Sequence, residues 1–178
     1  MSRTSHLLLM ASYNATMNRN IYQAARTLPA QVLAADRKAF FGSILGTLNH
    51  LVNGDTFWLK RFAAHPACFA QLDPIRALAS PASLAEIQFN DIDSLWERRR
   101  WLDDLILAWT AAITAADLDV MLGYVNSRGP ANKNFFNLLM HFFNHQTHHR
   151  GQVSTLLSQE GVDIGVTDLL MLIPDEAR

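Results

Sequence analysis

Four of the seven histidines of this 178-residue chain lie within nine positions, in the segment HFFNHQTHHRGQ at residues 141–152. On a helix, residues four positions apart lie one turn apart on the same face, close enough for two imidazoles to bind one metal ion. At about 100° per residue, His149 falls within the apolar stripe of such a helix and His145 at its edge. His141 and His148 fall farther round, towards solvent. His145 and His149 are therefore the candidate pair of metal ligands.

Two histidines alone do not establish a metal site. A single buried histidine on a helix is more often a hydrogen-bonded core residue, and HxxxH lacks the glutamate that a zinc peptidase carries in HExxH. A catalytic site of the zinc type has three protein ligands and one open position. Either another element supplies a third ligand, or the histidines form only a structural network.

The elements that must position these residues are predicted to be helices, because apolar residues recur every three or four positions. We expect long helices at residues 4–28, 40–64, 92–116 and 132–160, and a short helix at 167–173. Residues 65–90 contain three prolines and are predicted to form a long crossover connection, whereas residues 119–130 are predicted to be an extended stretch or hairpin. The predicted fold class is all-α: a four-helix bundle with a short C-terminal helix, in one domain spanning residues 1–178.

His50 is the leading candidate for a third ligand, because His6 lies near a terminus and His65 in the proline-containing connection. Its position presents a difficulty, since on the second predicted helix it lies nearly opposite the apolar stripe. Gly46 and Gly54 flank it at four-residue spacing, and glycines there cost about 1 kcal/mol each but let another helix approach closely. We therefore expect this helix to bury two faces, one around a polar site and one against the core or a second subunit. Periodicity alone does not select His50.

Charge and composition exclude several classes of protein. The formal net charge is −1, so the chain lacks the basic excess that nucleic-acid binding usually requires. The one dense run, ERRR at 97–100 followed by DD at 103–104, is predicted to be the solvated face of the third helix. No apolar stretch is long enough to span a membrane, and no signal peptide is expected. A single cysteine, Cys68, permits no intrachain disulfide, which favours a cytoplasmic location.

Two segments resemble the DinB (DNA-damage-inducible, YfiT-like) family: DRKAFFGSILGTLNHLVNGDTFWLKRF at 36–62 and HFFNHQTHHRGQVSTLL at 141–157. The ending GVTDLLMLIPDE is similar too. The resemblance implies a four-helix bundle in which one histidine of the second helix and an HxxxH pair of the fourth hold a divalent metal. By position these ligands are His50, His145 and His149. In similar sequences the place of His148 often holds tyrosine, which argues against it as a ligand. The resemblance also implies a homodimer and, from the family's name, a stress response.

The resemblance further implies a function. Three neutral ligands leave a divalent ion its full charge and open positions, and zinc, nickel or Fe(II) would each suit them. Related proteins are thiol-dependent transferases and isomerases that use a low-molecular-weight thiol. The implied activity is transfer of an exogenous thiol to a small-molecule electrophile, with metal-dependent hydrolysis as another reaction open to such a site. No catalytic residue beyond the ligands is assigned.

Two alternatives belong to other classes. The first is a non-catalytic metal-binding, sensor or stress-response protein, which has the same histidines but needs no substrate pocket. The second is a structural dimer without metal, in which the histidines form a hydrogen-bonded network. Metal content separates the second alternative from the rest, and affinity for a thiol separates the first from the enzyme.

Other residues carry weaker hypotheses. Cys68 lies in the proline-containing connection and is a poor candidate nucleophile. Asp55 is either a hydrogen-bond partner of a ligand ring or part of an ordinary surface salt bridge. The remaining expectations are a hydrogen bond to the metal face for Gln152, a salt bridge to another helix or subunit for Arg150, a core or pocket-wall position for Trp58, and a pocket-mouth position for Tyr124 and Asn126.

Overall fold

The computed structural model describes residues 1–175, and most of them are helical. The α-helices are α1 (Arg3–Ala25), α2 (Ala30–Ala34), α3 (Ile44–Phe62), α4 (Asp73–Ala77), α5 (Ile92–Ala112) and α6 (Phe135–Gln159). Two strands, β1 (Met121–Asn126) and β2 (Gly129–Asn134), and three short 3₁₀ turns, η1 (Ala70–Leu72), η2 (Asp117–Asp119) and η3 (Leu169–Leu172), complete the described elements. The all-α prediction is therefore correct in outline, with a small two-stranded sheet added.

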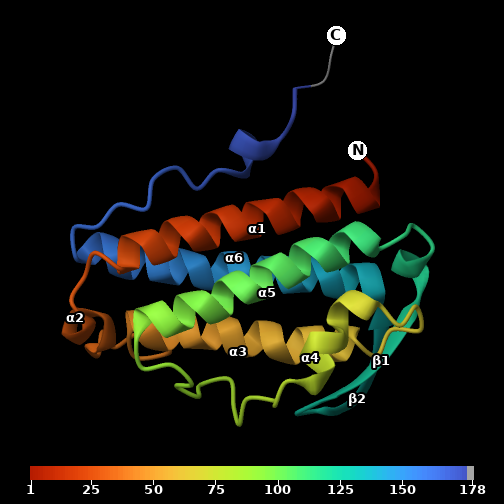
Figure 1. The fold of residues 1–178 in the computed structure, drawn as a ribbon, viewed down its shortest axis with the longest axis horizontal. Helices are drawn as coiled ribbons and strands as arrows, with labels where there is room; N and C mark the ends of the chain where they lie inside the picture. The colour runs from red at the N-terminus through yellow and green to blue at the C-terminus, as the bar shows by residue number, and fades with distance from the viewer. Residues whose placement is uncertain (176–178) are drawn as a thin grey trace.

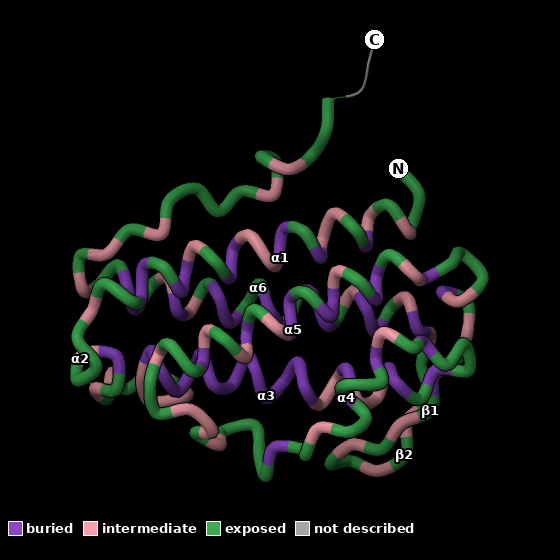
Figure 2. Tube along the Cα trace, in the orientation of Figure 1, coloured by how far each residue is buried: buried purple, intermediate pink, exposed green. Residues whose placement is uncertain are grey.

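The four long helices lie side by side (Figure 1). Helix α1 packs against α5 and α6, and α3 packs against the same two helices, so each long helix has two long neighbours. Buried residues follow the helix faces that turn towards the middle of this group (Figure 2). Large apolar side chains fill that interior, among them Phe62, Trp109, Phe135 and Phe142.

Polar side chains at the helix starts set where the long helices begin. Ser43 accepts a hydrogen bond from the Gly46 amide, Asp91 from Ser94, and Asn134 from Asn137, which are N-cap contacts. The cap at Asn134 corrects the sequence prediction for the last long helix, because residues 132–134 belong to β2 and the helix starts at Phe135. The cap at Ser43 likewise shows that the predicted second helix starts at Ile44, four residues later than expected. The short helix α2 precedes it.

The hairpin predicted around residues 119–130 is present and continues to Asn134. Strands β1 and β2 are antiparallel, with Met121 opposite Asn134 and Asn126 opposite Gly129. Gly129 has a φ of 107°, a conformation that residues with a side chain rarely adopt. The hairpin leads directly into α6 and lies beside the C-terminal end of α3 (Figure 1).

The connection between α3 and α5 covers the face of α3 that carries His50, nearly opposite the apolar stripe. Asn49 and Asn53 of α3 donate to the backbone carbonyls of Phe89 and Glu86, and a ring nitrogen of His50 contacts the carbonyl of Leu84 at 3.1 Å. Every residue from Ile44 to Thr56 is consequently buried. The prediction of two buried faces is correct, and the chain's own connection covers the second face.

The last predicted helix, at 167–173, is only the single 3₁₀ turn η3, and it is mostly exposed. Within residues 1–175, no helix combines the length and the apolar character needed to cross a membrane.

Candidate metal centre

His50 of α3 meets His145 and His149 of α6 in the interior between the two helices. The Nε2 atom of His50 lies 3.3 Å from Nε2 of His145 and 3.1 Å from Nε2 of His149. One nitrogen from each ring lies within 4.8 Å of the other two. The structure therefore brings together the three residues proposed from the sequence, although they come from positions almost 100 residues apart.

The opposite ring nitrogens fix the orientation of two of the three rings. Nδ1 of His50 contacts the carbonyl of Leu84 at 3.1 Å, and Nδ1 of His149 contacts Oε1 of Gln152 at 2.7 Å. Both partners are acceptors, so both Nδ1 atoms carry the hydrogen and both Nε2 atoms present a lone pair. Two lone pairs 3.1 Å apart repel each other unless a proton or a cation lies between them.

Burial holds the three rings neutral. His50 is 3% exposed and His149 is 9% exposed. Burial lowers the pKa of His50 to about 4; burial, and then the neighbouring His149 and His50, lower the pKa of His145 to about 3. Burial also lowers the pKa of His149, and the hydrogen bond that its Nδ1 donates to Gln152 opposes that shift. At neutral pH all three rings are in the uncharged form that binds metal ions.

Two further residues, Phe41 and Gly54, shape the site, and only Gly54 is indicated by the sequence pattern. The ring of Phe41 stacks on His50 with centroids 3.7 Å apart and also contacts His149, so it forms an apolar wall. Gly54 lies against His145: a Cβ atom built on it would be 3.1 Å from Cε1 of that ring. The four-residue spacing of Gly46, His50 and Gly54 hinted at this close approach, whereas nothing in the sequence indicated Phe41.

The arrangement fits a divalent metal ion. In a tetrahedral site with metal–nitrogen bonds of about 2.0–2.1 Å, neighbouring nitrogens lie roughly 3.3 Å apart. The Nε2 separations of 3.3 and 3.1 Å match that spacing. Three neutral nitrogen ligands suit zinc, nickel and Fe(II) alike. His141 and His148 do not join the cluster: His148 is exposed, and His141 packs against Trp58 one turn away from His145.

A cavity of about 380 Å³ opens beside His145. His145, His141, Trp58 and Asn126 are among its lining residues, so the pocket positions predicted for Trp58 and Asn126 are correct. Tyr124 packs on Trp58 with centroids 5.5 Å apart. The cavity gives a small molecule access to the ring of His145.

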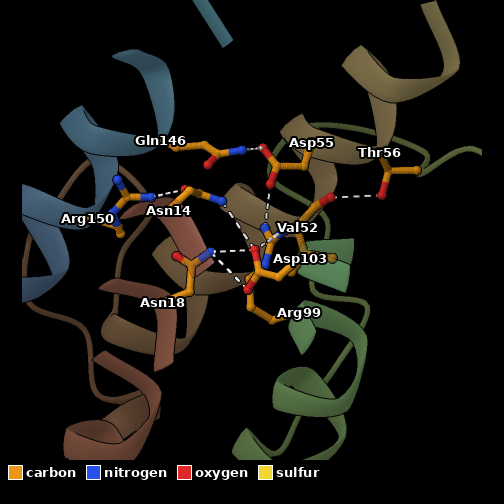
Figure 3. Close-up of polar contacts among 9 residues, drawn as sticks. All are labelled: Asn14, Asn18, Val52, Asp55, Thr56, Arg99, Asp103, Gln146 and Arg150. Atoms are coloured by element: carbon orange, nitrogen blue, oxygen red, sulfur yellow. Dashed lines mark hydrogen bonds and ion pairs between the residues drawn. The ribbon is translucent and has the colours of Figure 1, made fainter. Parts of the chain in front are cut away.

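A second polar cluster lies in the same interior and contains polar or charged residues from all four long helices (Figure 3). Asp55 of α3 pairs with Arg99 of α5, which also lies 2.9 Å from Asp103. The side chains of this buried ionic network come from α1 (Asn14, Asn18), α3 (Asp55), α5 (Arg99, Asp103) and α6 (Gln146, Arg150). Two carboxylates and two guanidiniums leave it neutral in sum.

The network corrects two sequence predictions. Arg99 and Asp103 belong to the run that was expected to be a solvated face, yet they are only 1% and 5% exposed. Asp55 forms a salt bridge, as one hypothesis held, but a fully buried one, and its hydrogen-bond partner is Gln146 at 2.9 Å rather than a ligand ring. Arg150 contacts another helix as expected, through Asn14 rather than a carboxylate. Burial raises the pKa of Asp55 and Asp103, and Arg99 opposes that rise.

The chain is similar to known proteins of one described family. The model of the family described as "DinB family" matches residues 1–176. Protein DinB of Bacillus subtilis (strain 168) is 26% identical over 162 residues, which cover 88% of this chain and 87% of that protein. No solved structure gives a significant match to the chain.

Proposed function

The chain belongs to the DinB family, and we propose that it is a divalent-metal protein in which His50, His145 and His149 hold the ion. One observation carries this proposal: Nε2 of His50 lies at a metal-ligand spacing from Nε2 of both His145 and His149, and the Nδ1 partners of His50 and His149 leave the lone pairs of those two rings facing each other. Only a proton or a cation relieves that repulsion, and burial disfavours the proton.

We propose further that the protein is an enzyme that transfers an exogenous thiol to a small electrophile. Bound by three neutral imidazoles, a divalent ion lowers the pKa of a thiol or water beside it. Leu84 and Gln152 orient the ligand rings, Phe41 excludes water from one side, and the cavity beside His145 admits the reactants. In the reaction the thiol loses its proton, its sulfur bonds to the electrophilic carbon, and the leaving group departs with the electrons of the broken bond.

The thiol comes from a separate molecule in this proposal. The chain's own Cys68 is exposed in the connection after α3, and it is absent from the residues that line the cavity beside His145. The finer assignments expected from the sequence belong to the same proposal: the four long helices form a four-helix bundle, the chain is one domain, and it works as a homodimer in the cytoplasm. The exposed apolar residues Val166, Leu170 and Met171 near η3 support self-association.

Cobalt(II) tests the proposal, because its visible absorption reports coordination number and geometry. Untagged, metal-free protein is titrated with Co²⁺, and we expect saturation at about one ion per chain with the intense spectrum of a tetrahedral or five-coordinate site. Addition of 2-mercaptoethanol is then expected to produce a sulfur-to-cobalt charge-transfer band. His149→Ala is expected to abolish the cobalt spectrum, and the exposed His148→Ala to leave it unchanged. Failure of the wild type to bind cobalt would contradict the metal site, and uptake of cobalt without a thiol band would favour a non-catalytic metal protein.

A further inference from the structure

Arg61, near the C-terminal end of α3, is a cation without an acidic partner. Its guanidinium lies over the ring of Trp58, 4.6 Å from the centroid, and over Tyr124 at 5.2 Å. It forms no ion pair with any of residues 1–175, although it is partly buried. Burial is the main influence on its pKa, which it lowers, and no carboxylate offsets that effect. The aromatic rings hold the side chain in place but leave its hydrogen-bond donors unused.

Arg61 lines the same cavity of about 380 Å³ that reaches His145. The polar groups around it are His141, Asn126 and Ser127, and the apolar wall is formed by Phe57, Trp58 and Leu84. Among the described residues that line this cavity, none is an aspartate or a glutamate. The space therefore combines one positive charge, neutral hydrogen-bonding groups and an apolar body, which is the composition of a small-molecule site.

The helix places Arg61 and the histidine cluster at two ends of one face. His50, Gly54, Phe57 and Arg61 occupy positions i, i+4, i+7 and i+11 of α3, within about 60° of one another. Gly54 has no side chain at the point where the cavity meets His145. The Cα atoms of His50 and Arg61 are roughly 16 Å apart along the helix, and long helical side chains lean back towards the N-terminus. A ligand a few carbon atoms long can thus extend from Arg61 towards the histidines.

Arg98 of α5 shows that packing over aromatic rings does not by itself indicate a ligand-binding arginine. Its guanidinium also lies over two rings, Phe89 at 5.5 Å and Trp101 at 5.4 Å, and it is similarly shielded. The cavity around Arg98, however, includes the carboxylate of Glu97, and none of the three clustered histidines lines it. Arg61 differs because its surroundings supply no negative charge and because its cavity continues to a proposed metal ligand.

We propose that Arg61 binds the carboxylate of a small organic ligand whose apolar chain or ring fills the cavity towards His145. The planar guanidinium matches a carboxylate with two parallel hydrogen bonds, and Asn126 and Ser127 lie where they can donate to the same group. A single guanidinium balances a single negative charge, which favours a carboxylate over a phosphate dianion. The proposal rests on the proposed function only in placing the other end of the ligand at the metal centre.

The first experiment needs no metal. Metal-free, untagged protein is titrated by calorimetry with 4-phenylbutyrate, with the neutral 4-phenylbutyramide and with phenyl phosphate. We expect the carboxylate to bind at least tenfold more tightly than the amide, and Arg61→Gln to weaken carboxylate binding by roughly tenfold to a hundredfold without changing amide binding. Arg61→Lys is expected to restore part of the loss, and Arg98→Gln, the matched control, to bind as the wild type does. Equal weakening by Arg61→Gln and Arg98→Gln, equal binding of amide and carboxylate, or tighter binding of phenyl phosphate would overturn the proposal.

The second experiment tests whether one ligand contacts both Arg61 and the proposed metal centre. Cobalt-loaded protein is titrated with ω-mercapto carboxylates of three, six and eleven carbons and with mercapto alcohols of the same lengths, and the charge-transfer band is followed. We expect one carboxylate length to bind best and Arg61→Gln to remove that preference while leaving the alcohols unchanged. Dependence on length that is identical for acids and alcohols would contradict the proposal. If cobalt does not bind but 4-phenylbutyrate still requires Arg61, the proposed function fails and this inference stands.

Discussion

The interior of the protein contains two polar clusters, and they differ in what offsets the free-energy cost of burying polar groups. In the buried ionic network, two carboxylates pair with the guanidinium of Arg99, and Arg150, two asparagines and a glutamine supply further hydrogen bonds (Figure 3). In the histidine cluster, three neutral rings meet, and two of them, His50 and His149, turn lone pairs towards each other. In the network both carboxylates are paired with Arg99, although Nε and Nη2 of Arg99 and Oε1 of Gln146 form no hydrogen bond. In the histidine cluster, the facing nitrogens of His50 and His149 have no cation between them among the described residues. The first arrangement is that of a structural device, and the second is that of a ligand site.

The two clusters are adjacent on α6. Gln146 and Arg150 of the network each follow directly after one of the clustered histidines, His145 and His149. Because neighbouring helical residues point about 100° apart, the network holds α6 by one face and the histidines occupy the next. The network thereby fixes the rotation of α6 that aims the two rings at His50.

The largest effect is expected from breaking the network. Arg99→Met leaves Asp55 and Asp103 buried without their cation, and we expect a loss of about 3–5 kcal/mol in the free energy of unfolding. Urea unfolding of metal-free protein measures it. The exposed neighbour Arg100→Met is the control and should unfold close to the wild type. A loss in Arg99→Met no greater than that of the control would show that the network does not stabilise the fold.

Substitution in the histidine cluster should change the stability of the metal-free protein much less. In metal-free protein, His145→Leu replaces a ring whose Nδ1 has no hydrogen-bond partner, and we expect the free energy of unfolding to change by less than about 1 kcal/mol. Zinc at a hundredfold excess over its dissociation constant should stabilise the wild type by about 2.7 kcal/mol and His145→Leu far less. Urea unfolding with a chelator measures the stability of the metal-free proteins, and urea unfolding with zinc measures the stabilisation by the ion. Equal stabilisation of the two proteins by zinc would place the ion elsewhere.

Substitution of two glycines by alanine distinguishes effects on helix stability from effects on metal affinity. Ala at position 54 brings its Cβ to 3.1 Å from Cε1 of His145, so we expect Gly54→Ala to weaken metal binding by roughly tenfold. Ala at position 151 of α6 meets nothing within 4 Å, so Gly151→Ala should leave metal binding unchanged. Gly151→Ala should also raise the free energy of unfolding by up to about 1 kcal/mol, because alanine is the better helix former. Competition with a chromophoric chelator measures the affinities, and equal values for the two variants would refute the close approach at Gly54.

The stability of the metal-free protein is also expected to depend on pH. The folded pKa values of about 4 for His50 and about 3 for His145 lie below the value of 6.5 in the unfolded chain. Between pH 6.5 and 4 the unfolded chain therefore binds more protons, and metal-free protein should lose stability as the pH falls through this range. The loss should be smaller in His145→Leu, and the difference between the two proteins cancels the contribution of the carboxyls. Parallel profiles would mean that His145 does not titrate differently on folding.

The sequence was sufficient for the helices and for the HxxxH pair, because both depend on local periodicity. It could not select His50 from its own helix, since the residues that cover that face, Leu84 to Phe89, come from an irregular connection 34 to 40 residues later. It also misplaced Arg99 and Asp103, because a charged pair at i and i+4 has the same pattern whether it faces water or a buried Asp55. Family resemblance supplied His50, and only the tertiary contacts show why it is buried there.

The most direct test of the central claim is elemental analysis of untagged protein after equilibration with zinc, nickel or Fe(II) and removal of free metal. The wild type and His148→Ala should each retain about one ion per chain, and His50→Ala and His149→Ala should both lose it. That result would show that α3 and α6 share one ion between them. No retained ion in the wild type with any of the three metals, or an ion retained in both His50→Ala and His149→Ala, would contradict the account.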